Sequence, residues 1–116
     1  MRVIVCGGRE FSNIAFMWSK LDDLHSERHF THFMQGGAPG ADLLAKEWAR
    51  TKAGLIRYEC KAKWKELGKA AGPIRNRRMM EWLPDLVVGF PDPQSVGTWD
   101  MIKIARAAGV ETIVCR

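Results

Sequence analysis

The residues of this chain best suited to chemistry lie in glycine-rich turns that could bind an anion. The first turn, Gly7-Gly8-Arg9-Glu10, follows a short run of β-type residues. Because glycine has no side chain, backbone N–H groups in such a turn can approach a phosphate closely. Arg9 could add a bidentate contact to phosphate or carboxylate. The alternative interpretation is a plain turn that carries a surface pair of opposite charges.

The second turn, QGGAPGAD, spans residues 35–42 and leads into a helical pattern. Free amides and the positive end of the helix dipole converge at such a point, so Gly36, Gly37 and Gly40 form a plausible anion cradle. Asp42 falls in the first helical turn, where a negative charge also serves simply to complement the dipole. The run has neither the GK[ST] ending of a Walker loop nor the GxGxxG spacing of a dinucleotide-binding turn.

The third turn, Gly97-Thr98, precedes another helical pattern. Thr98 is expected to be the N-cap residue, and its hydroxyl and the neighbouring amides could hold a phosphate. Asp100 lies just inside the helix. It could be a catalytic carboxylate, an acceptor for a ribose hydroxyl, or only a favourable charge for the helix dipole.

The segment at residues 61–78 is strongly basic, and most of its lysines are expected to form the solvated face of a helix. Its basic residues are Lys61, Lys63, Lys65, Lys69, Arg75, Arg77 and Arg78. Arg75 and Asn76 fall in the first turn of a helix expected to begin at Pro73, from which they would project donors into a crevice. Trp64 could pack as a lid, stack on a base or belong to the core.

Short β-type runs must position these turns, and most of them are continuously apolar, as expected of parallel strands covered on both faces. They span residues 2–6, 31–35, 55–60, 85–90 and 111–115. Helical patterns separate them, at residues 13–28, 40–53, 73–83 and 98–108. This alternation predicts a single α/β domain over residues 1–116. We expect a doubly wound, mainly parallel five-stranded sheet of order 3-2-1-4-5, with helices on both faces.

In such a sheet the ligand crevice lies beyond the carboxyl ends of the strands, where the strand order reverses. The loops that follow residues 6, 35, 60 and 90 should therefore meet there, and these loops contain the residues named above.

The composition of the chain limits the chemical class of the expected partner. The net charge of +5 and the pI near 9.4 suit an anionic partner, either a phosphate-bearing small molecule or a nucleic acid. No apolar run is long enough to span a membrane and no signal region follows Met1-Arg2, so we expect a cytoplasmic protein. The sequence lacks a CxxC pair, and no acidic residue completes the pair His25 and His29, so we expect neither a metal nor a cofactor.

Four segments together carry a resemblance to a known family. They are VCGGREF, QGGAPGAD, KAAGPIRNRRM and GTWDM, in this order. In them the chain resembles the YspA-like branch (domain of unknown function 2493) of the SLOG superfamily, over nearly its whole length. The resemblance implies a Rossmann-like fold that binds a nucleotide or a nucleotide-derived ligand, commonly in a dimer or larger assembly.

More distant SLOG relatives are the LOG phosphoribohydrolases and the DNA-processing protein DprA. By resemblance to the LOG enzymes, Arg75 and Arg77 are the candidate catalytic arginines, Gly97-Thr98 matches the GT of a PGGxGTxxE loop, and Asp100 falls near its acid. The departures are clear. Pro91-Asp92-Pro93-Gln94 replaces the PGG, and the acid is one methylene shorter.

Three functions remain open from the sequence. The leading expectation is binding of a nucleotide-derived small molecule of the NAD or ADP-ribose class, for sensing or sequestration. The second is phosphoribohydrolase activity, which would cleave the N-glycosidic bond of a nucleoside monophosphate. The third is binding of single-stranded nucleic acid, as in DprA, through residues 61–78. We also expect a homo-oligomer, a dimer or tetramer, because five tryptophans are many for one small domain to bury.

Overall fold

The structure, a computed structural model, describes residues 1–116 and contains one five-stranded sheet. All strand pairs are parallel and the order is β3-β2-β1-β4-β5, which confirms the predicted topology. The strands are β1 (Arg2–Gly7), β2 (His32–Gln35), β3 (Ile56–Glu59), β4 (Leu86–Phe90) and β5 (Glu111–Val114).

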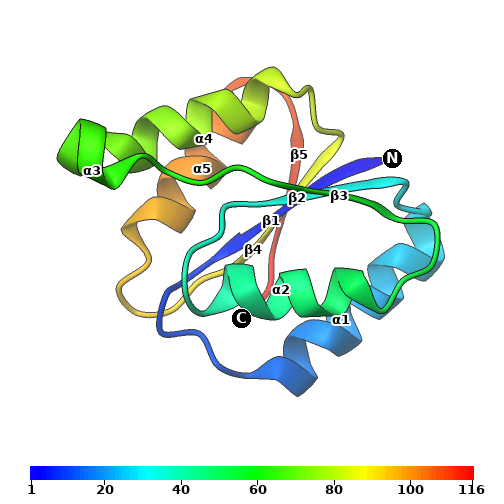
Figure 1. The fold of residues 1–116 in the computed structure, drawn as a ribbon. Helices are drawn as coiled ribbons and strands as arrows, with labels where there is room; N and C mark the ends of the chain where they lie inside the picture. Colours follow the sequence, from blue (N-terminus) through cyan, green and yellow to red (C-terminus); the bar gives the residue numbers. More distant parts are fainter.

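Helices cover both faces of the sheet, also as predicted (Figure 1). α1 (Ile14–Arg28) and α2 (Ala41–Arg50) pack on one face, and α4 (Ala71–Glu81) and α5 (Val96–Ala107) pack on the other. The short α3 (Trp64–Leu67) and the 3-10 turn η1 (Gly68–Ala70) connect β3 to α4. None of these helices combines the length and the apolar character that crossing a membrane requires.

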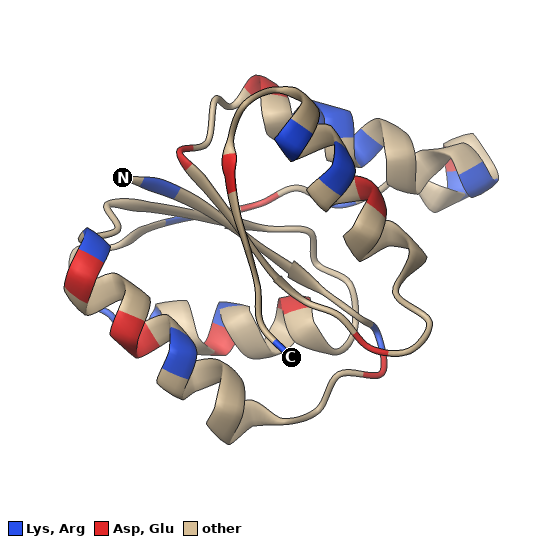
Figure 2. Cartoon of the chain, turned by 180° about the vertical axis from the view of Figure 1, so that it is seen from behind, with Lys and Arg blue, Asp and Glu red and all other residues tan.

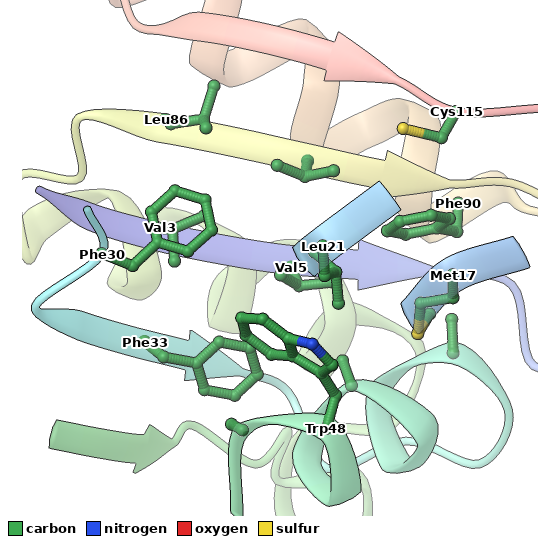
Figure 3. Packing of buried hydrophobic residues seen from close by; sticks show 14 of the residues in the cluster. Val3, Val5, Met17, Leu21, Phe30, Phe33, Trp48, Leu86, Phe90 and Cys115 are labelled. Carbon is green, nitrogen blue, oxygen red and sulfur yellow. The ribbon is translucent and has the colours of Figure 1, made fainter. Parts of the chain in front are cut away.

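The larger core lies between the sheet and the layer formed by α1 and α2 (Figure 3). Val3 and Val5 of β1 and Val88 of β4 are fully buried there, together with Trp48 of α2. The indole Nε1 of Trp48 donates to Oδ1 of Asp22, 2.9 Å away, so the one polar atom of this side chain is satisfied. Burial of a side chain of this size stabilises the fold by roughly 3 kcal/mol.

The smaller core lies on the opposite face of the sheet. The residues of β1 and β4 that alternate with those of the larger core point to this face. Ile4 and Val87 pack there against Met79 of α4 and Met101 of α5. Because β1 and β4 are buried on both faces, their apolar residues are continuous rather than alternating.

The edge strand β3 departs from this pattern. Its residues are all exposed, with Ile56 at 48% and Tyr58 at 45%, and none belongs to either core. The sequence predicted cover on both faces for most of the strands, and β3 is an edge strand, which needs no helix over each face. The expected homo-oligomer stays a prediction.

Two helix starts also differ from the predictions. α4 begins at Ala71, so Pro73 is its third residue, which a helix tolerates because the first N–H groups have no intrahelical partner. α5 begins at Val96 with Ser95 at the N-cap position. The prediction of Thr98 as the N-cap is wrong, and Thr98 instead lies inside the first turn of α5.

The paired histidines at the end of α1 have structural roles. Nδ1 of His25 accepts the backbone N–H of Phe30 at 3.1 Å, and its ring stacks on Phe30 and packs edge-on against Trp48. His29 ends the helix in a left-handed conformation, with φ of 54°.

The register of the two central strands brings the glycine turns together. Gly7 at the end of β1 pairs with Phe90 at the end of β4. A Cβ on Gly7 would lie 2.4 Å from Cβ of Ala41, the first residue of α2. Gly7 therefore lets the start of α2 approach the end of β1, and this approach positions one side of the site.

Candidate functional site

A cavity of about 630 Å³ opens beyond the carboxyl ends of β1 and β4, where the strand order reverses. The first two glycine turns supply Gly7, Gly8, Arg9, Glu10, Gly36 and Asp42 to its walls. The later segments supply Trp64, Arg75, Asn76, Gly97, Thr98 and Asp100. Residues that the sequence analysis selected from four separate loops thus line one hollow.

Three of the selected residues do not line it. Gly37 and Gly40 are outside the cavity lining, and both have left-handed φ values, 74° and 80°. A Cβ on Gly40 would lie 2.4 Å from the carbonyl oxygens of Gly8 and Arg9, so this glycine allows the first two turns to pack against each other. Arg77 is exposed on α4, outside the cavity.

The first turn holds a carboxylate of the chain itself. The amide of Gly8 donates to the carbonyl oxygen of Phe90 at 3.0 Å, and the amide of Glu10 donates to Oδ2 of Asp92 at 2.8 Å. A Cβ on Gly8 would lie 1.9 Å from the same Oδ2. The missing side chain of Gly8 therefore makes room for Asp92.

The other oxygen of Asp92 organises the loop between β4 and α5. Oδ1 accepts the amide of Gln94 at 2.7 Å and the hydroxyl of Ser95 at 3.0 Å. The hydrogen bond from the Glu10 amide, followed by that from Gln94 and that from Ser95, lowers the pKa of Asp92. The carboxylate is thus held in its charged form.

The second turn also encloses an internal carboxylate, that of Asp42. The amide of Ala38 donates to its Oδ2 at 3.1 Å, and the nearby amide of Gly36 also favours the charged carboxylate. Asp42 is only 4% exposed, and this burial raises its pKa to about 6 despite the opposing effects of those amides and of Arg75. Burial, together with the nearby Asp42, raises the pKa of Cys6 as well, so this thiol stays neutral at the cavity floor.

Arg75 connects α4 to the second turn. Its Nη1 donates to the carbonyl oxygen of Gly36 at 2.9 Å, and its Nε donates to Oδ1 of Asn76 at 3.0 Å. The guanidinium therefore anchors the turn, while its positive charge still faces the cavity.

The third turn is organised differently, because its amides have no internal partner. The hydroxyl of Ser95 is hydrogen-bonded to Asp92 and makes no capping bond to the helix. The amides of Gly97 and Thr98 have no acceptor in the protein. Thr98 is only 3% exposed, yet its Oγ1 makes no hydrogen bond, which makes it the one buried side-chain polar atom without a partner. An unsatisfied buried hydroxyl costs about 1–3 kcal/mol, so such a group points to a partner supplied from outside.

Asp100 stands next to this helix start with a fixed orientation. Nδ2 of the buried Asn76 donates to Oδ2 of Asp100 at 2.9 Å and to the carbonyl oxygen of Gly97 at 3.2 Å. This amide therefore holds one oxygen of the half-buried carboxylate, and the residue lines the cavity.

The mouth of the cavity has a stacked pair. Cζ of Arg9 lies 5.2 Å from the ring centroid of Trp64, whose side chain is 46% exposed. A Cβ on Gly72 would lie 3.2 Å from Cη2 of Trp64, so the ring lies against the start of α4. Of the roles considered for Trp64, membership of the core is therefore wrong.

Charges of both signs line the cavity. Basic residues are numerous along η1 and α4 (Figure 2). The cations at the cavity are Arg9, Lys69 and Arg75, and the carboxylates are Glu10, Asp42, Asp92 and Asp100. Sequence reasoning selected neither Lys69 nor Ser95 for the site, and it noted Asp92 as a departure from the LOG loop that could add negative charge beside a phosphate. The spacing Asp-x-x-Ser at residues 92–95 is a local signal for a side-chain-stabilised turn, and it could have identified Asp92 and Ser95.

Comparisons with known proteins agree with this geometry. A model of the YspA, cpYpsA-related SLOG family matches residues 1–66, more than half of the chain. The chain belongs to this family. It is also 34% identical over 117 residues to the Gene 61 protein of Mycobacterium phage D29, an alignment that covers 97% of this chain and 94% of the phage protein.

Membership of the SLOG family suggests a nucleotide-related ligand-binding role or a related one. The matched part contains the first two glycine turns and Trp64. The similarity to the phage protein extends over nearly the whole chain, and so into the region of the third turn and Asp100.

Proposed function

We propose that the cavity binds a nucleotide-derived small molecule, a class that runs from nucleoside monophosphates to ADP-ribose and NAD, for sensing or sequestration. The observation that carries this proposal is the unpartnered hydroxyl of Thr98. It is buried beside free amides at the first turn of α5, where the helix dipole favours an anion.

The rest of the cavity suits the remainder of such a molecule. Arg9 and Trp64 offer a planar surface at the mouth on which a base can stack. Asp100 and Asp92 offer carboxylate oxygens that can accept ribose hydroxyls. A volume of about 630 Å³ lies in the range of ordinary small-molecule sites.

Titration calorimetry with AMP, ADP-ribose, cyclic ADP-ribose and NAD tests the proposal. At least one of these should bind, and Lys69→Ala should weaken that binding several-fold because Lys69 lines the cavity. Lys65→Ala is the matched control, since Lys65 lies on the neighbouring α3 and does not line the cavity. Correctly folded protein that binds none of the four ligands would refute the proposal.

A second candidate function is favoured by the pairing of Asn76 with Asp100. In this proposal, water adds to the sugar carbon as the N-glycosidic bond of a nucleoside monophosphate breaks, and the free base leaves with a proton. Asp100 would stabilise the positive charge that develops on the sugar ring. No oxidant or cofactor is needed for this step.

Chromatography of AMP incubated with the protein tests this activity. Appearance of adenine and ribose 5-phosphate is the expected result, with a loss of at least about a hundredfold in Asp100→Asn. Glu66→Gln removes an exposed carboxylate of α3 outside the cavity and should leave turnover within about threefold of the native rate. Unchanged turnover in Asp100→Asn would show that this residue has no catalytic role.

A further inference from the structure

The carboxylate of Asp92 lies where the first glycine turn would otherwise receive an anion from a ligand. Asp92 belongs to the loop before α5, but its Oδ2 accepts the amide of Glu10 at 2.8 Å across the end of the sheet. The same atom lies against Gly8, at a distance that leaves no space for a side chain there. The bare backbone of this turn therefore faces a group supplied by the chain itself.

This position of Asp92 is fixed by its surroundings. Its other oxygen accepts the amide of Gln94 and the hydroxyl of Ser95, and the amide of Asp92 donates to Oγ of Ser95 at 2.6 Å. The carboxylate of Asp92 thus accepts three hydrogen bonds, from the amides of Glu10 and Gln94 and from the hydroxyl of Ser95. A phosphate that entered the first turn would have to displace this carboxylate or lie beside it.

The second turn is closed to anions for the same reason. Asp42 takes the amide of Ala38 and is buried beside Gly36. At the turn before α5, by contrast, the amides of Gly97 and Thr98 have no acceptor, and the buried hydroxyl of Thr98 beside them has no partner. No carboxylate of the chain occupies this turn, which leaves it open to an anionic group.

We propose that Asp92 is a specificity-determining residue that closes the first glycine turn to anions. It restricts the ligand to one anionic group, bound at the start of α5, and favours a neutral, hydroxyl-bearing group beside the first turn. A second phosphate would meet the negative charge of Asp92 and of the neighbouring Glu10, whereas a ribose hydroxyl could donate to the carboxylate. This inference rests on the proposed function, which it narrows from the whole nucleotide-derived class to ligands with a single phosphate.

The native protein provides the first arm of the test, because it needs no variant to fold. Calorimetry at constant ionic strength should give a dissociation constant for AMP at least about fivefold lower than that for ADP or ADP-ribose. Equal or tighter binding of the pyrophosphate compounds would overturn the inference and leave the proposed function intact. No binding of any of the three would overturn the inference, and failure of cyclic ADP-ribose and NAD to bind as well would overturn the proposed function too.

The second arm uses Asp92→Asn, which removes the charge at nearly constant shape. We expect affinity for ADP to rise about tenfold while affinity for AMP changes less than about threefold. Glu66→Gln is the matched control, because Glu66 is an exposed carboxylate of α3 that does not line the cavity. It should shift the ratio of the two affinities less than Asp92→Asn does. Equal gains for AMP and ADP in Asp92→Asn would show that Asp92 has no selective effect.

Discussion

The turn between β2 and α2 and the turn before α5 are both glycine-containing starts of helices, yet they differ in what their amides bind. In the turn between β2 and α2, Asp42 from the following helix folds back and accepts the amide of Ala38. In the turn before α5, the amides of Gly97 and Thr98 have no acceptor in the chain.

The glycines themselves report the same difference. A Cβ on Gly36 would lie 2.2 Å from Nη1 of Arg75, whereas a Cβ on Gly97 would meet no atom within 4 Å. Glycine in the filled turn serves close packing within the protein, while glycine at the open turn leaves space in front of the helix. The comparison teaches that a glycine-rich run marks a close approach to the backbone without saying what approaches it.

The largest expected effect comes from Gly40→Ala, which tests the packing of the filled turn. This residue has φ of 80°, and an added Cβ would lie 2.4 Å from two backbone carbonyl oxygens. The left-handed conformation and the clash together should lower the free energy of unfolding by about 3 kcal/mol. Urea denaturation measures the change.

Gly97→Ala is the matched control for that substitution. Its added Cβ meets open space in a helix, so stability should stay unchanged or rise by up to about 1 kcal/mol. Similar losses in the two variants would contradict the distinction between a packed turn and an open one.

The next prediction concerns pH and the buried carboxylate of the filled turn. Since the pKa of Asp42 is raised to about 6 in the folded protein, the folded state binds its proton more tightly than the unfolded state does. Its contribution to stability is therefore fully present below about pH 4 and is lost as the pH rises through about 6. Asp42→Asn should remove this loss, which amounts to about 3 kcal/mol, so the difference between native and variant stability should change by that amount from pH 4 to pH 7.

Chemical denaturation at several pH values measures this difference. Subtracting the two profiles removes the effects of carboxylates that both proteins share, such as Asp22 and Glu59, whose pKa values are lowered and whose contributions are lost at more acidic pH. Asp23→Asn, at an exposed position of α1, should reproduce the native profile. Parallel profiles for native protein and Asp42→Asn would contradict the assignment.

The smallest expected effect on stability tests the open turn. Thr98→Val removes the unpartnered hydroxyl at constant shape, so the free protein should become more stable by about 1 kcal/mol. The same change should weaken ligand binding about tenfold, because a hydrogen bond to an anion is lost. Differential scanning fluorimetry and calorimetry measure the two effects.

Thr98→Ser is the control, since it keeps the hydroxyl, and it should keep most of the binding. A valine variant that is less stable than the native protein and binds ligand equally well would show that the hydroxyl has an internal partner.

The sequence predicted which loops meet where position along the chain was sufficient. Three glycines lie in the segments that follow different strands, namely Gly8 after β1, Gly36 after β2 and Gly97 after β4. Because parallel strands place their carboxyl ends at one edge of the sheet, the proximity of these glycines followed from the predicted topology. Asp100 could be placed beside Gly97 for the same reason. The position of Asn76 on a helix that begins near the crevice was also recognisable.

Other features could not be predicted, because they depend on contacts between distant segments. Nothing local in the first turn indicates that Asp92 would occupy it, and the role of Gly40 depends on carbonyl oxygens of residues far earlier in the chain. Thr98 was taken for an N-cap because a glycine-threonine pair is typical of helix starts, whereas Ser95 takes that position. The exposure of β3 follows from its place at the edge, where a strand needs no cover.

By itself the amino-acid sequence determined the order of strands and helices, because apolar runs and glycine stops act locally, and the parallel topology then fixed which loops meet. Only the tertiary structure decided which amides of those loops are already bound and which are free. The reason is physical: a backbone N–H is satisfied by whichever acceptor lies within about 3 Å, and in this protein the acceptors come from side chains whose positions depend on the packing of the whole fold.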